Sequence, residues 1–261
     1  MKRCAALLFA TAVLAAATPS FAQVTVMTSG GFRAAFTQLA PELERTTGIT
    51  ITMVIGASQG PGPDTIGAQL RRGVFADVVI MSREGLEDLI AEGRIAAGTD
   101  VNLAQTPLGL SVRAGAPKPD ISSVDAVRQT LLGAKSVAFR ASTTGIYLTT
   151  KLFPRLGISE EMARKSTTAG VAAVASGNAE LAIQPVSELL PQAGADFVGT
   201  LPVEIQYVSV FSAAVLAGSR EPAASGRLIA FLASPQATAA IQRSGMARVD
   251  NRVEWPGEGD V

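Results

Sequence analysis

The sequence predicts an α/β protein built from two lobes, and three observations support this prediction. Short apolar runs alternate with amphipathic stretches after Gln23, as they do when helices cover a sheet. The chain has 261 residues, enough for two lobes of roughly 100 to 130 residues each. Near Pro107 a strand leads into a turn-rich segment, and a second set of strand and helix units begins.

This change of pattern sets the expected lobe boundaries. We expect residues 23–106 and 210–261 to form the first lobe and residues 107–209 to form the second. Two strands, near 108–113 and 207–216, are expected to cross between them. A ligand cleft would then lie between the lobes.

The elements of the first lobe follow from local periodicity. Phe36, Leu39 and Leu43 share one face at helical spacing and predict a helix over 32–46. Residues 76–81 form an almost continuous apolar run, which is typical of a strand buried on both faces. The same reasoning predicts strands at 24–27 and 49–55 and helices at 64–72 and 85–92.

The second lobe and the returning segment show the same alternation. The polar turn at 142–145 is expected to open a helix that runs to about Leu156. The other expected elements are strands at 136–139 and 181–183 and helices at 123–132, 171–176, 223–232 and 235–244.

Residues 1–22 have the features of an export signal. Lys2 and Arg3 precede an apolar run over 5–17, which ends in a small-residue cleavage region at 19–22. The alternative is a buried N-terminal helix. Cleavage would also remove Cys4, the only cysteine, which lies before the apolar run and therefore cannot accept a lipid. We expect an exported, cysteine-free monomer in the periplasm, with no membrane insertion, because the run is too short to span a bilayer.

Composition excludes several functions. The 22 Lys and Arg residues balance 22 Asp and Glu residues and only 5% of the residues are aromatic, which argues against a nucleic-acid partner. The chain has no histidine. A Ser-His-Asp or Cys-His nucleophile system and a His-ligated metal site are therefore excluded, and we expect no metal site.

Four strands end in small, hydroxyl-rich turns that open helices, at residues 28–31, 57–60, 142–145 and 184–187. A helix N-terminus attracts anions through its unpaired N–H groups and its dipole. In open α/β sheets such turns lie at the carboxyl ends of strands, where ligands bind. The alternative is that each Ser or Thr only caps its helix. Four such turns, two in each lobe, favour an anion held in a cleft.

The candidate ligand-binding residues lie in or beside these turns. They are Ser29, Gly30, Gly31, Ser58, Arg140, Ser142, Thr143, Gly145 and Gln184. The Arg140 guanidinium, directly before the third turn, suits a bidentate contact with a carboxylate, and the alternative is a surface ion pair. Arg33, Arg71 and Arg72 are weaker candidates, because each fits a solvated helix face.

These segments resemble the periplasmic molybdate-binding-protein-like family, which has the type 2 periplasmic-binding fold. The resemblance rests on the order of elements, on Ser29 and Ser58 in their turns, and on residues 76–80 and 182–188. True molybdate binders hold a tetrahedral oxyanion with two serines, backbone amides and a late tyrosine. This sequence has Gln184 at the late turn instead of a tyrosine and adds a guanidinium before the third turn, which argues against molybdate.

Within the family, residues 26–32 and 184–190 are most similar to the aconitate isomerase branch. The resemblance implies a tricarboxylate substrate and interconversion of cis- and trans-aconitate by an allylic proton shift. A base removes a methylene proton and an acid returns one to the far carbon, without a metal, nucleotide or redox cofactor. The alternative function is a passive receptor that delivers an oxyanion or a di- or tricarboxylate to an ABC-type transporter.

The sequence leaves the base open between a carboxylate, a tyrosine, a lysine and a positioned hydroxyl. Tyr147, in the first turn of its expected helix, and Ser58 are the candidate catalytic residues. The alternative for Tyr147 is a packed aromatic, and Ser58 also suits a ligand donor. Glu188 is expected to point away, because its charge would repel an anionic substrate.

Overall fold

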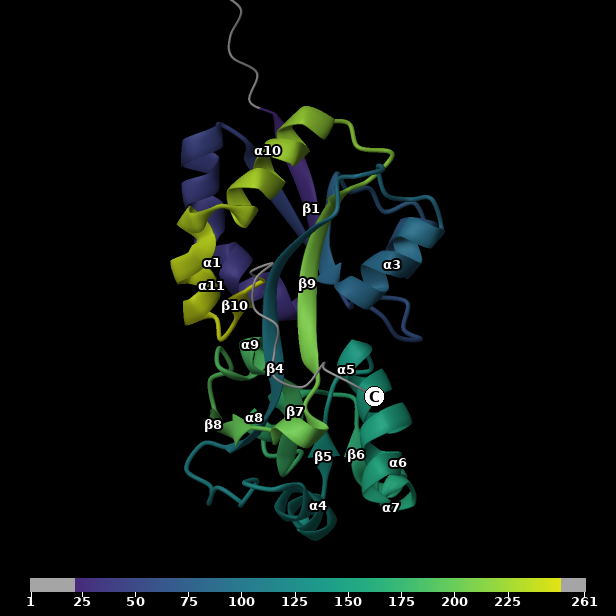
Figure 1. Ribbon diagram of the computed structural model, residues 1–261, viewed down its shortest axis with the longest axis vertical. Helices are drawn as coiled ribbons and strands as arrows, with labels where there is room; N and C mark the ends of the chain where they lie inside the picture. The colour runs from purple at the N-terminus through teal and green to yellow at the C-terminus, as the bar shows by residue number, and fades with distance from the viewer. Residues whose placement is uncertain (1–21, 250–261) are drawn as a thin grey trace, which may run out of the picture.

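The computed structural model describes residues 22–249 and shows two lobes stacked along the long axis of the molecule (Figure 1). The export signal expected at 1–22 therefore lies, apart from Ala22, outside the described residues. Within the described part of the chain, no helix is both long and apolar enough to cross a membrane.

The first lobe alternates strands and helices as predicted. Its elements are β1 (Gln23–Ser29), α1 (Gly30–Thr47), β2 (Thr50–Gly56), α2 (Ile66–Arg71), β3 (Val78–Ser82) and α3 (Arg83–Ala91). After the second lobe, the chain returns and adds β9 (Val208–Val215), α10 (Pro222–Ala233), a 3-10 turn (Pro235–Ala237), α11 (Thr238–Arg243) and β10 (Ala247–Arg248).

The second lobe has shorter elements. They are α4 (Val124–Gly133), β5 (Val137–Ala138), α5 (Thr143–Tyr147), a π-helical segment (Leu148–Leu152), α6 (Phe153–Leu156), α7 (Ser159–Lys165), β6 (Ser166–Thr167), α8 (Val171–Ala175), β7 (Leu181–Pro185), α9 (Val186–Leu189), β8 (Ala195–Thr200) and a 3-10 turn (Val203–Ile205). The helical run from α5 to α6 confirms the helix predicted to reach Leu156.

Two long strands join the lobes. The strand order is β2-β1-β3-β9-β4-β7-β5-β6, with β4 (Val101–Arg113) and β9 at the centre (Figure 1). β1 pairs in parallel with β2 and β3, and β5 pairs in parallel with β6 and β7, whereas β9 is antiparallel to β3 and β4. Parallel strands within each lobe direct their carboxyl ends, and the turns that follow them, toward one edge.

The crossing strand β4 begins at Val101, earlier than the strand predicted at 108–113. Its first half pairs with β9 as far as Pro107, and from Leu108 it pairs with β7. Proline lacks an N–H and therefore suggests the end of a strand rather than its middle. Pro107 lies where β4 changes its partner from β9 to β7. Because a proline suggests a strand boundary, the sequence predicted only the half of β4 that follows it.

The longest elements that were not predicted are α7 and β8. The β8 segment has the sequence ADFVGT, which mixes small and polar residues and shows no clear alternation. It is a strand because it pairs with β4 along the edge of the second lobe. Such pairing is a tertiary contact that local periodicity does not contain.

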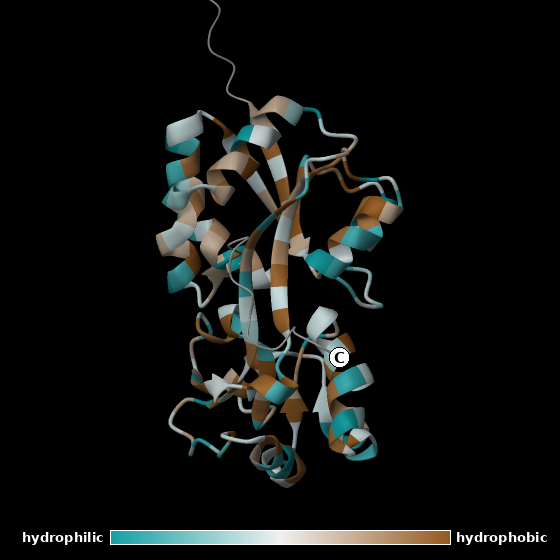
Figure 2. Ribbon diagram, viewed as in Figure 1, coloured by the Kyte–Doolittle hydropathy of each residue, from teal (hydrophilic) through white to brown (hydrophobic). Residues whose placement is uncertain are grey.

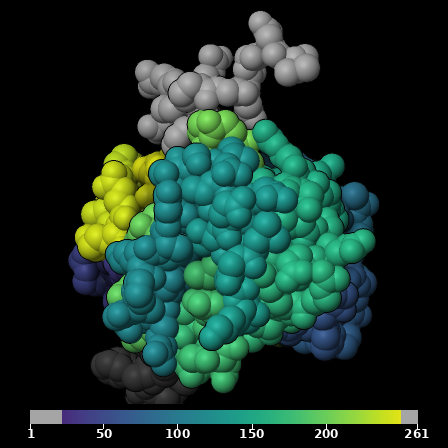
Figure 3. Space-filling model, turned by 90° about the horizontal axis from the view of Figure 1, so that it is seen from below, coloured from purple at the N-terminus to yellow at the C-terminus, as the bar shows by residue number. Residues whose placement is uncertain are grey.

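Each lobe has its own buried clusters. Phe32, Phe36 and Leu228 belong to a cluster of the first lobe and returning segment, whereas Leu110 and Phe153 belong to one of the second lobe. Apolar stretches lie along β9 and in the second-lobe strands, and α3 carries both apolar and polar residues (Figure 2). Seen from below, residues from the middle of the chain form the surface toward the viewer (Figure 3). Because each lobe has its own buried cluster, we propose that residues 23–106 and 210–261 form the first lobe and residues 107–209 the second.

Candidate functional site

A cavity of about 810 Å³ lies between the lobes, and all four polar turns line it. The first lobe contributes the ends of β1 and β2, and the second contributes the N-terminus of α5 and the end of β7. Of the predicted site residues, those that line the cavity are Ser29, Gly30, Ser58, Arg140, Ser142, Thr143 and Gln184.

Two serine hydroxyls in the cavity wall have no partner. Ser29 is 3% exposed and Ser187 is 1% exposed, and neither Oγ atom forms a hydrogen bond with any described residue. Ser29 stands at the N-cap of α1 and yet its side chain does not cap the helix. An unsatisfied buried hydroxyl is costly, so both atoms are available to an anionic ligand. The sequence placed Ser187 in the polar turn at 184–187, but Ser187 was not predicted to bind the ligand.

Side-chain capping occurs at two helices of the first lobe that follow other residues than the four polar turns. Thr65 and Ser82 accept hydrogen bonds from the backbone N–H groups of Ala68 and Gly85 and cap α2 and α3. Ser142, at the start of α5, makes no such bond. Ser58 Oγ accepts a hydrogen bond from Ser82 N at 2.8 Å, which leaves its own hydroxyl hydrogen free to donate.

Two guanidinium groups line the cavity from opposite lobes. Arg33 lies on α1 and Arg140 directly before α5. No Asp or Glu among the described residues is within ion-pair distance of either one, so the surface ion pair considered for Arg140 does not form. Arg71, by contrast, pairs with Glu92 at 2.7 Å. The cavity therefore offers two free cationic groups to an anion.

Glu188 also lines the cavity, so the expectation that it points away is wrong. A Cβ atom placed on Gly30 would lie 3.4 Å from Glu188 Oε1, and Gln184 Nε2 donates a hydrogen bond to Glu188 Oε2. Burial raises the pKa of the Glu188 carboxyl above its ordinary value, while Arg140 and the bond from Gln184 oppose the rise. Gln184 lies in β7 and Glu188 lies on α9, so no helical spacing in the sequence indicated this contact.

Three predicted residues lie outside the cavity wall. The Tyr147 hydroxyl donates to the Ile205 carbonyl at 3.0 Å, its ring stacks on Tyr207, and burial raises its pKa. Its expected orientation toward the cleft is therefore corrected: it packs within the second lobe. A Cβ on Gly31 would lie 2.0 Å from the Phe211 ring, and one on Gly145 2.3 Å from the Arg140 carbonyl, so both glycines serve close packing.

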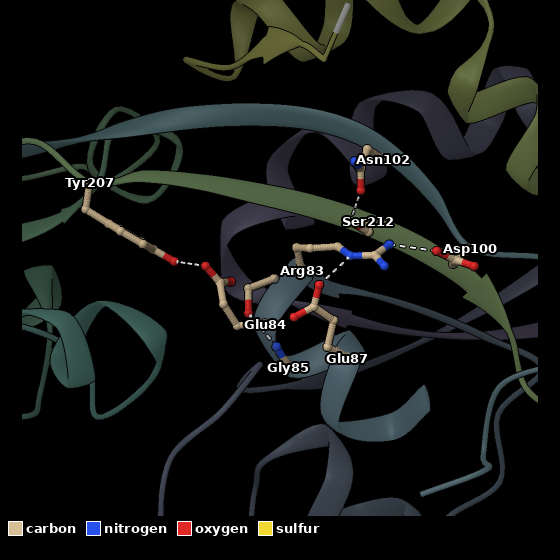
Figure 4. Close-up of polar contacts among 9 residues, drawn as sticks. Arg83, Glu84, Gly85, Glu87, Asp100, Asn102, Tyr207 and Ser212 are labelled. Carbon is tan, nitrogen blue, oxygen red and sulfur yellow. Dashed lines mark hydrogen bonds and ion pairs between the residues drawn. The ribbon is translucent and has the colours of Figure 1, made fainter. Parts of the chain in front are cut away.

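Several polar contacts join the lobes beside the cavity. Thr143 Oγ1 lies 2.9 Å from Ser82 Oγ and donates to Gln59 Oε1 at 3.1 Å. Near the start of β9, the Tyr207 hydroxyl donates to Glu84 at the beginning of α3 (Figure 4). Burial and this contact raise the pKa of the Tyr207 phenol. These bonds link the two lobes.

Beside Glu84, a second set of contacts belongs to the first lobe alone. Arg83 pairs with Asp100 at 2.7 Å and with Glu87 at 3.2 Å (Figure 4). Among residues 22–249, no three Asp, Glu, His or Cys side chains gather in a way that suits a metal ion.

Comparisons with known proteins agree with this geometry. The model of a family described as bacterial extracellular solute-binding protein matches residues 24–247. A protein named aconitate isomerase from Pseudomonas sp. is 39% identical over 248 residues, covering 94% of each chain. The molybdate-binding protein ModA of Mycobacterium tuberculosis is 25% identical, covering 86% of this chain and 84% of that one.

Solved structures confirm the type 2 periplasmic-binding fold. The periplasmic molybdate-binding protein of Azotobacter vinelandii superposes with a TM-score of 0.70 at 21% identity. The match covers 86% of this chain and 98% of that one. The two-lobed α/β architecture predicted from the sequence is therefore confirmed.

Proposed function

This chain belongs to the bacterial extracellular solute-binding protein family, and on that premise we propose that it is an isomerase that interconverts cis- and trans-aconitate in the cleft between its lobes. The similarity to a protein of that name, which extends over nearly the whole of both chains, supports the proposal. We further propose that the protein works in the periplasm as a monomer, after removal of residues 1–22.

The observation that carries this function is the combination of free groups in the cavity. Arg33 and Arg140 provide two guanidinium groups without carboxylate partners, and Ser29 and Ser187 provide two buried hydroxyls without partners. Aconitate has three carboxylates at different ends of a short carbon chain. Separate cationic and hydroxyl groups on both lobes suit such an extended anion better than a compact tetrahedral one.

The chemistry requires groups that hold the carboxylates and groups that stabilise charge. When a methylene proton leaves, the negative charge spreads over the allylic carbons and the adjoining carboxylates. Arg140 and the N-terminus of the 18-residue helix α1 provide positive potential where this charge develops. Ser58, with its hydroxyl hydrogen free, is proposed as an additional donor to the same anion.

A second candidate function is a passive receptor for an oxyanion or a di- or tricarboxylate. The family description and the relatives named molybdate-binding protein favour it. A receptor closes on its ligand and leaves every C–H bond intact, so turnover separates the two functions.

We expect the purified mature protein to convert trans-aconitate to cis-aconitate and to reach the same ratio from either isomer. Chromatography of the mixture over time measures this conversion. Activity should persist in a metal chelator, because residues 23–261 contain no His or Cys. Binding of aconitate without any conversion would leave only the receptor function.

Replacing Arg140 by alanine should weaken aconitate binding by about one to two decades. A charge-assisted bidentate contact contributes about 1.5 to 3 kcal/mol. Calorimetry on the two proteins measures the difference. Arg155→Ala is a matched control, because Arg155 is exposed on the same lobe and lies outside the cavity wall. Equal affinities of Arg140→Ala and the parent protein would remove Arg140 from the site.

A further inference from the structure

Only a few titratable side chains line the cavity in the described part of the chain. They are Arg33, Asp64, Arg140 and Glu188. A guanidinium stays protonated and cannot act as a base. The choice of base among these titratable groups is therefore between two carboxylates. Asp64 is exposed on the loop before α2, whereas Glu188 is partly buried on α9 between the two lobes.

Glu188 is held in a defined orientation. Gln184, which is 1% exposed, accepts a hydrogen bond from Val171 N through Oε1 and donates through Nε2 to Glu188 Oε2. The amide is thus fixed at both ends and fixes one oxygen of the carboxylate. The other oxygen, Oε1, lies toward the start of α1 at Gly30, the residue that follows Ser29 with its unpartnered hydroxyl. One oxygen is anchored, and the other lies nearest Gly30, which lines the same cavity.

The surroundings of Glu188 suit a group that both takes and returns a proton. Its carboxyl is desolvated, which raises its pKa and makes its anion a stronger base than an exposed carboxylate. The Arg140 guanidinium lowers this pKa and keeps the anion accessible. The same guanidinium stands at the cavity wall, where it also stabilises negative charge on the substrate.

We propose that Glu188 is the catalytic residue that moves the proton between the two carbon atoms of aconitate, and that Gln184 is its positioning residue. This inference rests on the isomerase function proposed above. Glu188 Oε1 takes a proton from the methylene carbon, and the C–H electron pair enters the allylic system and its carboxylates. The resulting carboxylic acid then returns a proton to the former vinyl carbon, whose electron pair forms the new C–H bond. The Glu188 carboxylate is regenerated, and the double bond has moved by one position.

The same step accounts for the change of geometry. In the substrate, the bond between the methylene carbon and the central carbon is single and can rotate. After the shift this bond is the double bond. The torsion angle about it at the moment the proton leaves therefore decides whether the product is cis or trans. No oxidant, reductant or second substrate is needed.

Glu188→Gln tests the proposal, because it keeps the size of the side chain and an oxygen that accepts from Gln184. We expect turnover to fall by at least about 100-fold, the usual contribution of a positioned acid or base. Aconitate affinity by calorimetry should stay equal or rise, because a negative charge next to a trianion is removed. In deuterium oxide, NMR should show deuterium entering aconitate with the parent protein, because the carboxylic acid formed on Glu188 exchanges with solvent between the two transfers, and not with E188Q. Glu160→Gln, the same change at an exposed carboxylate of the same lobe that lies outside the cavity wall, should keep parental turnover.

Failure of this inference differs from failure of the proposed function. A parent protein that binds but never converts aconitate contradicts the isomerase itself. A parent protein that converts aconitate and an E188Q protein within about tenfold of it contradict the role of Glu188, as does an E188Q protein that has lost aconitate binding. If E188Q does not fold, Glu188→Asp decides. This variant shortens the reach of the carboxylate and should lose about 10- to 100-fold in turnover, and parental turnover would overturn the proposal.

Discussion

Replacing Gly60 by alanine is expected to weaken aconitate binding about 100-fold, although Gly60 lies outside the wall of the main cavity. A Cβ atom at this position would lie 2.0 Å from the backbone carbonyl oxygen of Ala141 in the opposite lobe. A backbone atom in a packed turn cannot move aside, so the lobes would have to separate. If separation costs about 3 kcal/mol in the closed state, the apparent affinity falls by about two decades. Calorimetry with aconitate measures this loss.

The matched control for Gly60 is Gly73. Both glycines have positive φ angles, +119° and +84°, so alanine strains the backbone at each position. A Cβ on Gly73 has no atom within 4 Å, and the residue lies in the same lobe. Gly73→Ala should therefore lower the melting temperature without changing aconitate affinity. Equal affinity of Gly60→Ala and Gly73→Ala would show that the contact with Ala141 does not govern closure.

Replacing Asp77 by alanine should lower the free energy of unfolding by about 3 to 5 kcal/mol. The carboxylate is 1% exposed, accepts from Thr25 N at 2.9 Å through Oδ2, and accepts from Ser219 Oγ and Arg220 N through Oδ1, both at 2.8 Å. It thus ties β1 and β3 to the loop before α10. Alanine would leave buried donors without partners, which is the costly outcome for such a network.

Urea denaturation followed by circular dichroism measures the Asp77 effect. Asp125→Ala is the control, because Asp125 is exposed in the first turn of α4 and favours that turn only through the helix dipole. Replacing Asp125 by alanine should change the free energy of unfolding by less than about 1 kcal/mol. If the two variants had the same stability, the buried network around Asp77 would not contribute as inferred. Asp77 belongs to the segment on which the family resemblance was based, and its role is structural.

The strand-turn-helix units were predictable because their signals are local. The polar turn at Ser29, the helical spacing of Phe36 and Leu39, and the apolar run that became β3 each depend on residues a few positions apart. The position of the turns also followed, because parallel strands bring their carboxyl ends to one edge. The sequence alone therefore places the four turns together.

Contacts between residues far apart in the sequence decided which way the side chains of the candidate site point. The helix that begins at α5 was predicted, but the direction of the Tyr147 ring depends on Tyr207 and on the Ile205 carbonyl, about 60 residues later. Glu188 lies on a helix of only four residues, whose orientation depends on packing against α1 and β7. Charge repulsion predicted that Glu188 points away, and the bond from Gln184 reverses that result.

Fold class, most strands and the polar turns thus followed from local pattern, because backbone conformation responds to near neighbours in the chain. The identity of the group proposed to move the proton required the folded chain. Which side chains face the cavity is set by packing between segments far apart in sequence, and periodicity along the chain carries no record of those contacts.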